Sequence, residues 1–520
     1  MHRVSHAGVE IGRLGRRLSR PLDPRPRRQM KSTFNRATGL LFVTVLLVVG
    51  CRNDSATTES GQTSSNPASD APSIADAVVA PDSTGPAAEI DLSSAEPTVD
   101  RASGPAGEST PATGPATIAA DEPQLEPAEL HDAALTALES GDLDRAFALA
   151  RKATSATPDD PQSTFLMARV LAERNRFPEA VKMLDDLLVE LPDARLPIYG
   201  QTADWLVLQG RYDEAEKRYR EILTEVPDAS MAQRTLAQLL LRQGRRLEAG
   251  TFLRQLCQSG VVEPSNLRSL LRLAYPFAAD ADTDELEPIG PLGRARVEIS
   301  QGNWQDALQS LKQADLKDPA VEALVGRIHA QLHLQGQDRE AFHRWAQSAL
   351  PTQNDAPDFW FAIATHHADQ GEHQEAVRCL CNAIRRDPTD AASYRLMAGS
   401  FNALEMDDRA AEASRRAELI AETHQIGEQM ASNPDIELDQ VSRLAELLDE
   451  LARPLEALAW RTVRVALERS RGTLSAQDAS QAITKINRDR LQRLQSGVAE
   501  STAAFHAFLC SEHDGTSSER

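Results

Sequence analysis

The sequence predicts an all-α protein built as a tandem array of helical hairpins. At 520 residues the chain is too long for one compact core, which favours several domains or a repeat array. Ala, Leu, Arg, Glu and Gln dominate the composition and aromatic residues make up only 4%, so helix is the default local structure. From residue 127 onward, one pattern of small residue, glycine, large residue, alanine and proline recurs with a period near 34 residues.

The charge of the chain argues against nucleic acid as a partner. The formal net charge is −21, although residues 1–50 are basic, with ten Lys or Arg against Glu10 and Asp23. The rest of the chain is therefore more acidic than the total suggests. A nucleic-acid surface needs clustered Lys and Arg, and an acidic body repels phosphates over roughly a Debye length.

Residues 30–50 have the three parts of a secretory signal peptide. A short basic segment begins at Met30 and precedes an apolar run, Gly39–Gly50, of about twelve residues, shorter than the roughly 18 needed to cross a bilayer. Residues 1–29 contain eight arginines ahead of this segment, and we interpret them as an extension before a true start at Met30. The sequence leaves open whether translation starts at Met1 or at Met30.

The end of this segment, Val48-Val49-Gly50-Cys51, resembles the bacterial lipobox. The resemblance implies cleavage before Cys51 and attachment of acyl chains, palmitate among them, to the new N-terminus, where two or three chains make a stable anchor. Arg52 follows in place of Asp, as in lipoproteins that are sent on to an outer membrane. We therefore expect a lipid-anchored protein of the bacterial cell envelope, at the outer membrane and facing the periplasm. The alternative is an ordinary signal peptide or an anchor helix followed by a chance cysteine.

Residues 51–126 are expected to form a disordered acidic tether behind the lipidated cysteine. The segment 52–126 is rich in Ser, Thr, Ala, Pro and Gly, lacks aromatic residues, and carries thirteen Asp or Glu against Arg52 and Arg101. Such a composition buries too little apolar surface to offset the entropy of ordering the chain.

The clearest copy of the repeated pattern runs from Pro357 to Asp390. Its signature positions resemble the tetratricopeptide repeat (TPR) family, in which glycine ends helix A, alanines sit where the helices cross closely, and proline follows helix B. The resemblance implies a right-handed superhelical solenoid of helix-turn-helix repeats that stack into one core and bind other proteins. These positions are Trp360, Ile363, Ala364, Gly371, Ala376, Leu380, Ala383 and Pro388.

The repeat register divides the chain into segments. Repeats are expected to start near residues 127, 161, 196, 230, 288, 322, 357 and 391, with one spacing of 58 residues that marks an insertion. The predicted segments are 127–263 (repeats 1–4), 264–287 (an insertion with an acidic loop), 288–424 (repeats 5–8), 425–500 (a degenerate TPR hairpin and a capping helix) and 501–520 (a disordered tail).

If the array has a ligand site, helix A positions should line it. In TPR proteins these positions face a concave groove, and arginines there could receive an acidic or C-terminal peptide. The alternative is that these side chains are solvated or paired with neighbouring acids. The carboxylate clamp of chaperone-binding TPRs is not evident. The groove candidates are Arg169, Arg234, Gln238, Arg242, Phe361, Arg395 and Asn402.

Metal and calcium sites are the less favoured interpretations of two clusters. Asp280, Asp282 and Asp284 alternate as calcium ligands do, but Glu285 replaces the turn glycine, so a solvated acidic loop is expected. Histidines and cysteines also gather in the later repeats, where surface histidines and packed thiols are expected instead of metal ligands. These residues are His329, His333, His366, His367, His373, Cys379 and Cys381.

No nucleotide loop, nucleophile elbow or haem-attachment motif occurs in the sequence. We expect no enzyme and no cofactor, but an envelope scaffold or adaptor that binds proteins. The alternatives are an accessory factor for envelope or glycan processing, and a metal-dependent hydrolase that would use the His and Cys cluster. The segment Pro454–Trp460 is also similar to TPR regions found beside UnbV/ASPIC-type β-propeller proteins, which would make such a propeller the partner.

Overall fold

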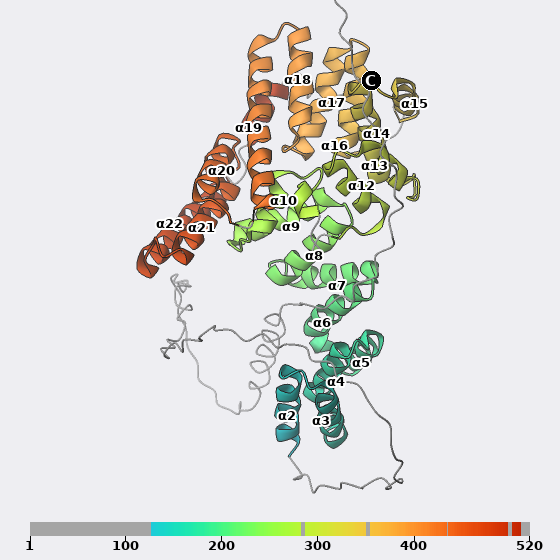
Figure 1. Ribbon diagram of the computed structural model, residues 1–520, viewed down its shortest axis with the longest axis vertical. Coiled ribbons are helices and arrows are strands. Elements are labelled where there is room, and N and C mark those ends of the chain that lie inside the picture. Colours follow the sequence, from blue (N-terminus) through green and yellow to red (C-terminus); the bar gives the residue numbers. More distant parts are fainter. Residues whose placement is uncertain (1–125, 282–286, 350–353, 434, 498–501, 511–520) are drawn as a thin grey trace, which may run out of the picture. The chain divides into compact units, whose positions relative to one another are not determined.

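The computed structural model describes residues 126–281, 287–349, 354–433, 435–497 and 502–510. Every regular element in these ranges is a helix, so the all-α fold class is confirmed (Figure 1). The described helices all belong to one compact unit, which begins at Pro123. The predicted extension, signal peptide and lipidated Cys51 lie outside the described residues. So do the tether up to residue 125, the acidic loop residues 282–286 and the tail from 511.

Helix pairs follow one another along residues 127–432, each with a helix A and a helix B that pack together. The observed helix A starts lie within three residues of the repeat starts expected from the sequence. The pairs are α2 (Pro127–Glu139) and α3 (Leu143–Ala156), α4 (Pro161–Glu173) and α5 (Phe177–Glu190), α6 (Arg195–Leu208) and α7 (Tyr212–Glu225), α8 (Ser230–Arg242) and α9 (Arg246–Ser259), α12 (Gly290–Ser300) and α13 (Trp304–Leu311), α14 (Pro319–Leu334) and α15 (Arg339–Ala349), α16 (Pro357–Asp369) and α17 (His373–Arg386), and α18 (Ala391–Ala403) and α19 (Asp407–Ser432).

Other helices interrupt or follow the repeats. A short 3-10 turn, η1, precedes α6, and two short helices form the insertion after repeat 4. A further hairpin and two more helices follow repeat 8. These elements are η1 (Pro192–Ala194), α10 (Pro264–Leu271), α11 (Ala278–Ala281), α20 (Leu438–Glu450), α21 (Pro454–Ser470), α22 (Ala476–Gln495) and α23 (Thr502–Cys510).

The turn from helix A to helix B requires a left-handed residue. In repeat 7 this residue is Gly371, with φ of +77°, and an added Cβ would meet nothing within 4 Å. Only glycine adopts this conformation without a steric cost. Three non-glycine residues occupy the equivalent left-handed turns elsewhere: Asn175, Glu405 and Ala452, with φ values of 58° to 60°.

Alanines and helix caps complete the local design. Asp160 caps α4, because its carboxylate accepts the N–H groups of Gln162 and Ser163 at 3.1 and 3.0 Å, and Pro161 fills the first helical position. In seven of the eight helix pairs described, helix B carries an alanine that is at most 3% exposed, at the crossing where a larger side chain would separate the backbones. These alanines are Ala146, Ala180, Ala215, Ala249, Ala307, Ala376 and Ala410.

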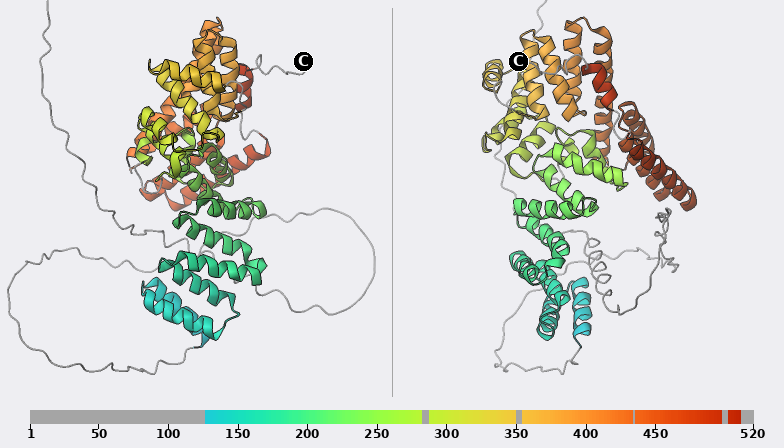
Figure 2. Two further views of the ribbon diagram at one scale, coloured as in Figure 1. Left: turned by 90° about the vertical axis from the view of Figure 1, so that its right-hand side faces the viewer. Right: turned by 180° about the vertical axis from the view of Figure 1, so that it is seen from behind.

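The core does not follow a simple linear stack. One hydrophobic cluster runs from repeat 2 through the insertion into the C-terminal part of α19, α20 and α21. Leu271, Phe277, Met430 and Trp460 belong to it and are each at most 2% exposed. Helices α9 and α10 therefore contact α21, and α10 and α11 contact α19, although they are far apart in sequence (Figures 1 and 2).

None of the described helices is long and apolar enough to cross a membrane.

Candidate functional site

The most open of the predicted groove positions lie on α18. Arg395 and Asn402 are both exposed and are seven residues apart, so they lie on one face of this helix. Gly399 lies between them, and a Cβ added there would meet nothing within 4 Å. We call Arg395, Gly399 and Asn402 the α18 face. Arg395 supplies a guanidinium, Asn402 supplies an amide, and the open space at Gly399 leaves room for the backbone of a ligand.

The candidates on α8 are more engaged with the protein itself. The Arg234 guanidinium forms an ion pair with Glu263 at 2.8 Å. Arg242 is half-buried, and its Nε donates to the backbone carbonyl of Glu287 at 2.9 Å. Gln238 is exposed between them. The two arginines of α8 therefore help to hold the segments that flank the insertion.

The last two candidates lie on separate helices. Arg169 is half-buried on α4, while Phe361 on α16 is only 1% exposed. The guanidinium carbon of Arg327 lies 3.6 Å from the centre of the Phe361 ring, and this guanidinium also donates to both carboxylate oxygens of Asp390, at 2.7 and 3.0 Å. The Phe361 ring is thus covered from within the chain. The groove candidates do not form one cluster, because they are distributed over α4, α8, α16 and α18.

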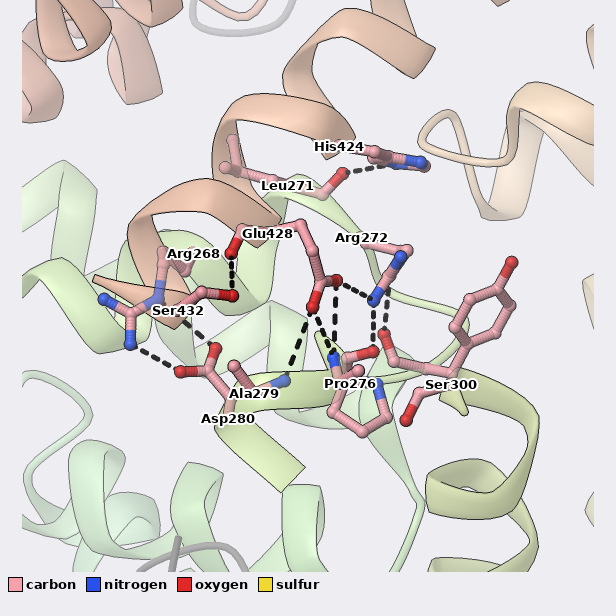
Figure 3. A network of polar contacts seen from close by, with 12 residues as sticks. Arg268, Leu271, Arg272, Pro276, Ala279, Asp280, Ser300, His424, Glu428 and Ser432 are labelled. Carbon is pink, nitrogen blue, oxygen red and sulfur yellow. Dashed lines mark hydrogen bonds and ion pairs between the residues drawn. The ribbon is translucent and has the colours of Figure 1, made fainter. Parts of the chain in front are cut away.

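The insertion is fixed to α19 through Glu428 (Figure 3). The Glu428 carboxylate accepts the backbone N–H of Ala278 at 3.1 Å and that of Ala279 at 3.4 Å, and it lies 3.5 Å from the Arg272 guanidinium. Arg272 in turn donates to the carbonyls of Tyr275 and Pro276. One carboxylate therefore satisfies the backbone of the insertion and a mostly buried arginine together.

Asp280 corrects one expectation from the sequence. The sequence predicts a solvated acidic loop here, but Asp280 is 8% exposed and pairs with the guanidinium of Arg268 at 2.6 and 3.2 Å (Figure 3). The physical reason is that α11 folds back against α19, which encloses the start of this loop. The partner arginine lies twelve residues earlier, outside the acidic run that the sequence displays.

Burial perturbs several charges around this junction. Burial first, and then the nearby Arg272, lowers the pKa of His424 to about 3. Its neutral ring donates an N–H to the Leu271 carbonyl at 3.1 Å. Burial and then the like charges of Arg272 and Arg296 lower the pKa of Arg246 to about 9. The junction is therefore a largely buried polar contact, and its groups serve the fold.

A depression of about 490 Å³ lies over the B helices α7 and α9. Three of its charged lining residues are paired with one another, since Glu216 binds Arg220 at 2.8 Å and Arg245 at 2.6 Å. A ligand there would have to break these ion pairs. The α18 face is therefore the better candidate for a ligand site than this depression.

The repeated turns, alanines and caps agree with a comparison against protein families. The tetratricopeptide repeat family model matches residues 137–196 and 206–272. These two segments of the chain are tetratricopeptide repeats. The resemblance drawn from the sequence is thereby confirmed for these residues, and tetratricopeptide repeats form scaffolds for protein–protein interaction.

Several solved structures are similar to the chain at low sequence identity. A tetratricopeptide repeat protein from Parabacteroides merdae is 14% identical with a TM-score of 0.23, over 53% of this chain and 99% of that one. The Cut9–Hcn1 heterotetramer of the APC/C is 13% identical with a TM-score of 0.25, over 74% and 88%. The TPR domain of P58(IPK) is 16% identical with a TM-score of 0.20, over 71% and 99%. No curated protein matches the chain.

Of the two cysteines expected to be packed thiols, Cys379 is one and Cys381 is not. Cys381 on α17 forms a disulfide with Cys510 on α23, with the two Cα atoms 5.9 Å apart. Cys379 is a buried thiol, and burial raises its pKa to about 12. Neither is therefore available as a thiolate ligand or nucleophile. The disulfide was missed because its halves are 129 residues apart and Cys510 carries no local motif.

The histidines are also arranged differently from the sequence pattern. His329 and His333 are four residues apart on α14, but the structure places His333 beside His343 and Asp369 instead. His343 was not among the candidates. Only the fold brings it to His333 and Asp369, because these residues lie on three different helices.

Proposed function

We propose that this TPR protein is a lipid-anchored scaffold of the bacterial cell envelope, held at the outer membrane through acylated Cys51 and facing the periplasm. The array receives a protein or peptide ligand, and the chain itself catalyses no reaction. The observation that carries the binding part of this proposal is the α18 face. It is open, whereas Arg234 and Arg327 are paired within the fold.

The chemistry of the α18 face favours an acidic peptide segment or a C-terminal carboxylate. Arg395 is exposed, and its planar guanidinium matches a carboxylate with two parallel N–H donors. The Asn402 amide offers both a donor and an acceptor, which suits a peptide backbone. The open space at Gly399 would let that backbone approach the helix. Recognition of this kind places a short ligand segment along α18.

The envelope location is supported by two independent features. The lipobox-like Val48–Cys51 ends a signal-type segment, and the acidic tether behind it would hold the array away from the membrane surface. The Cys381–Cys510 disulfide belongs to the part of the chain that would be exported. Disulfides persist in oxidising compartments such as the periplasm and are rare in a reducing cytosol.

Affinity capture tests the binding function. The full chain is used to capture proteins from a detergent-solubilised envelope of the source organism, in parallel with an Arg395→Ala/Asn402→Ala variant. The control is Arg378→Ala on α17, which removes an exposed arginine paired with Glu375 on helix B. We expect a discrete partner that the control retains and the double variant loses. A partner that the double variant retains as well as the Arg378→Ala control does would contradict the role of the α18 face.

A separate experiment tests the anchor. Cells that express the wild-type chain or Cys51→Ser are labelled with an alkyne palmitate analogue and then fractionated. We expect label and membrane association in the wild type, and the loss of both in the variant. Labelling that persists in Cys51→Ser would contradict the lipid-anchor proposal without touching the binding function.

A further inference from the structure

A second group of polar side chains lies where three consecutive helices meet. His333 is in the last turn of α14, His343 lies within α15, and Asp369 is the last residue of α16. His333 Nε2 lies 3.2 Å from Asp369 Oδ1, and His343 Nε2 lies 3.3 Å from Asp369 Oδ2. In the described part of the chain, one ligand atom from each residue falls within 4.8 Å of the other two.

We propose that His333, His343 and Asp369 bind a divalent transition-metal ion of the zinc class. Ligands 2.0 to 2.2 Å from a tetrahedral zinc ion are roughly 3.3 to 3.5 Å apart, which is close to each observed N–O distance. These distances run to the two different oxygens of Asp369, whose carboxylate would turn to present one of them to the ion. Two imidazoles and one carboxylate form a ligand set typical of zinc, with a fourth position for water. This departs from the absence of metal ligands expected from the sequence.

The surroundings hold the two histidines in position. Phe342 is fully buried, its ring stacks on His333 at a centroid distance of 4.8 Å, and it lies 5.5 Å from His343. His343 Nδ1 lies 3.3 Å from His366 Nδ1. When His343 Nε2 binds the metal, its Nδ1–H donates to His366. Partners of this kind fix the ring orientation and the tautomer of metal-binding histidines.

The electrostatics of the backbone favour a cation at this place. His333 and Asp369 both lie at helix C-termini, where the unpaired carbonyls carry partial negative charge. Arg339 is the opposing group, because its Nε and Nη2 each lie 3.3 Å from His343 and Asp369 respectively. Its side chain is 70% exposed and can therefore swing into solvent when a metal enters. The metal would then tie α14, α15 and α16 together.

Zinc titration of the full chain without a histidine tag tests this inference. Calorimetry of metal-free protein should show one Zn²⁺ per chain with micromolar or tighter affinity, no comparable heat with Mg²⁺, and a higher Tm when Zn²⁺ is bound. His333→Ala, His343→Ala and Asp369→Asn should each abolish tight binding. His366→Ala should weaken it by about tenfold, as is typical when the partner of a ligating histidine is removed.

Two controls keep the outcome specific. His131→Ala, on the distant α2, should leave Zn²⁺ affinity unchanged, whereas Arg339→Gln should bind several-fold more tightly because the competing charge is gone. Co²⁺ added to the wild type should give the visible absorption of a nitrogen- and oxygen-ligated site, which requires no variant to fold. Absence of stoichiometric Zn²⁺, or Zn²⁺ bound equally by the three ligand variants, would overturn the proposal. Neither result bears on the α18 face.

Discussion

The backbone N–H of Leu273 donates to the hydroxyl of Thr389 at 3.0 Å, across 116 residues of sequence. Thr389 itself donates to Asp387 at 2.6 Å, and Leu273, Thr389 and Asp387 are all at most 2% exposed. This contact joins the insertion after repeat 4 to the loop before repeat 8. Together with Glu428 on α19, it makes the TPR array a structure with long-range closure, whereas a solenoid usually has contacts between neighbouring repeats only.

Removing the Glu428 carboxylate should destabilise this junction. In Glu428→Ala, the backbone N–H groups of Ala278 and Ala279 lose their acceptor, and the Arg272 guanidinium loses one of its three partners. We expect a loss of about 1 to 2 kcal/mol in the free energy of unfolding, because solvent weakens hydrogen bonds to a carboxylate that is 38% exposed. Urea unfolding followed by circular dichroism measures it. Glu375→Ala, which breaks only an exposed ion pair with Arg378, should change stability by less than about 1 kcal/mol. A loss in Glu428→Ala no larger than that in Glu375→Ala would contradict the stabilising role of Glu428.

Substitutions at two turn residues should change the free energy of unfolding in opposite directions. Gly371→Ala places a Cβ at φ +77° with open space around it, so the cost of about 1 kcal/mol is conformational. Ala452→Gly relieves the same strain at φ 58° and should raise the free energy of unfolding by a similar amount. Thermal denaturation of the two variants measures both. A destabilised Ala452→Gly would mean that this alanine contributes packing that outweighs its strain.

The Cys381–Cys510 disulfide should be detectable and stabilising. Peptide mapping by mass spectrometry under non-reducing conditions should recover the linked pair, with Cys257 and Cys379 as free thiols. Cys510→Ser should lower the free energy of unfolding by about 2 to 4 kcal/mol, because α23 is no longer tied to α17. Dithiothreitol should destabilise the wild type but not the variant. A wild type that reacts with thiol reagents at Cys381 would contradict the pairing.

His424 should make stability depend on pH in a defined direction. Its pKa is lowered to about 3 in the folded state, chiefly by burial, so below its unfolded value near 6.5 the unfolded chain binds the extra proton. This contribution to stability is complete above pH 6.5 and is lost as the pH falls toward 3. Between pH 7.5 and 5.5 the loss is about 1.4 kcal/mol.

The measurement is urea unfolding of the wild type and His424→Gln at both pH values. The raised pKa of Asp387, about 6, acts in the opposite direction, so the difference between the two proteins isolates the histidine. We expect the variant to lack the loss on acidification that His424 causes. Parallel pH profiles would contradict the assignment of a neutral, buried His424.

The fold was accessible from the sequence because its signals are local. Gly371 and Ala376 mark a turn and a helix crossing within one repeat, and each acts on residues within about two turns of helix. The same local signals could not predict that Arg327 covers the Phe361 ring, since Arg327 belongs to the preceding repeat. The turns at Glu405 and Ala452 could not be recognised from a glycine, because these two residues adopt the left-handed conformation instead.

The candidate sites were harder to predict from the sequence, because they depend on contacts between residues that are far apart in the chain. Arg395 and Asn402 followed from their register on helix A, and both are exposed. His343 and Asp369 are 26 residues apart and match no metal motif, so only packing of α15 against α16 brings them together. Docking of the insertion on Glu428 depends on contacts about 150 residues apart in sequence, which no periodic pattern encodes.

Photo-crosslinking at Asn402 tests the central claim, ligand binding at the α18 face, most directly. A benzoylphenylalanine residue replaces Asn402 in cells of the source organism, and Arg378 on the opposite helix of the preceding repeat serves as the control position. We predict that ultraviolet light gives a discrete adduct with one partner protein at position 402 and none at 378. No adduct at position 402, or the same adducts at both positions, would contradict the claim.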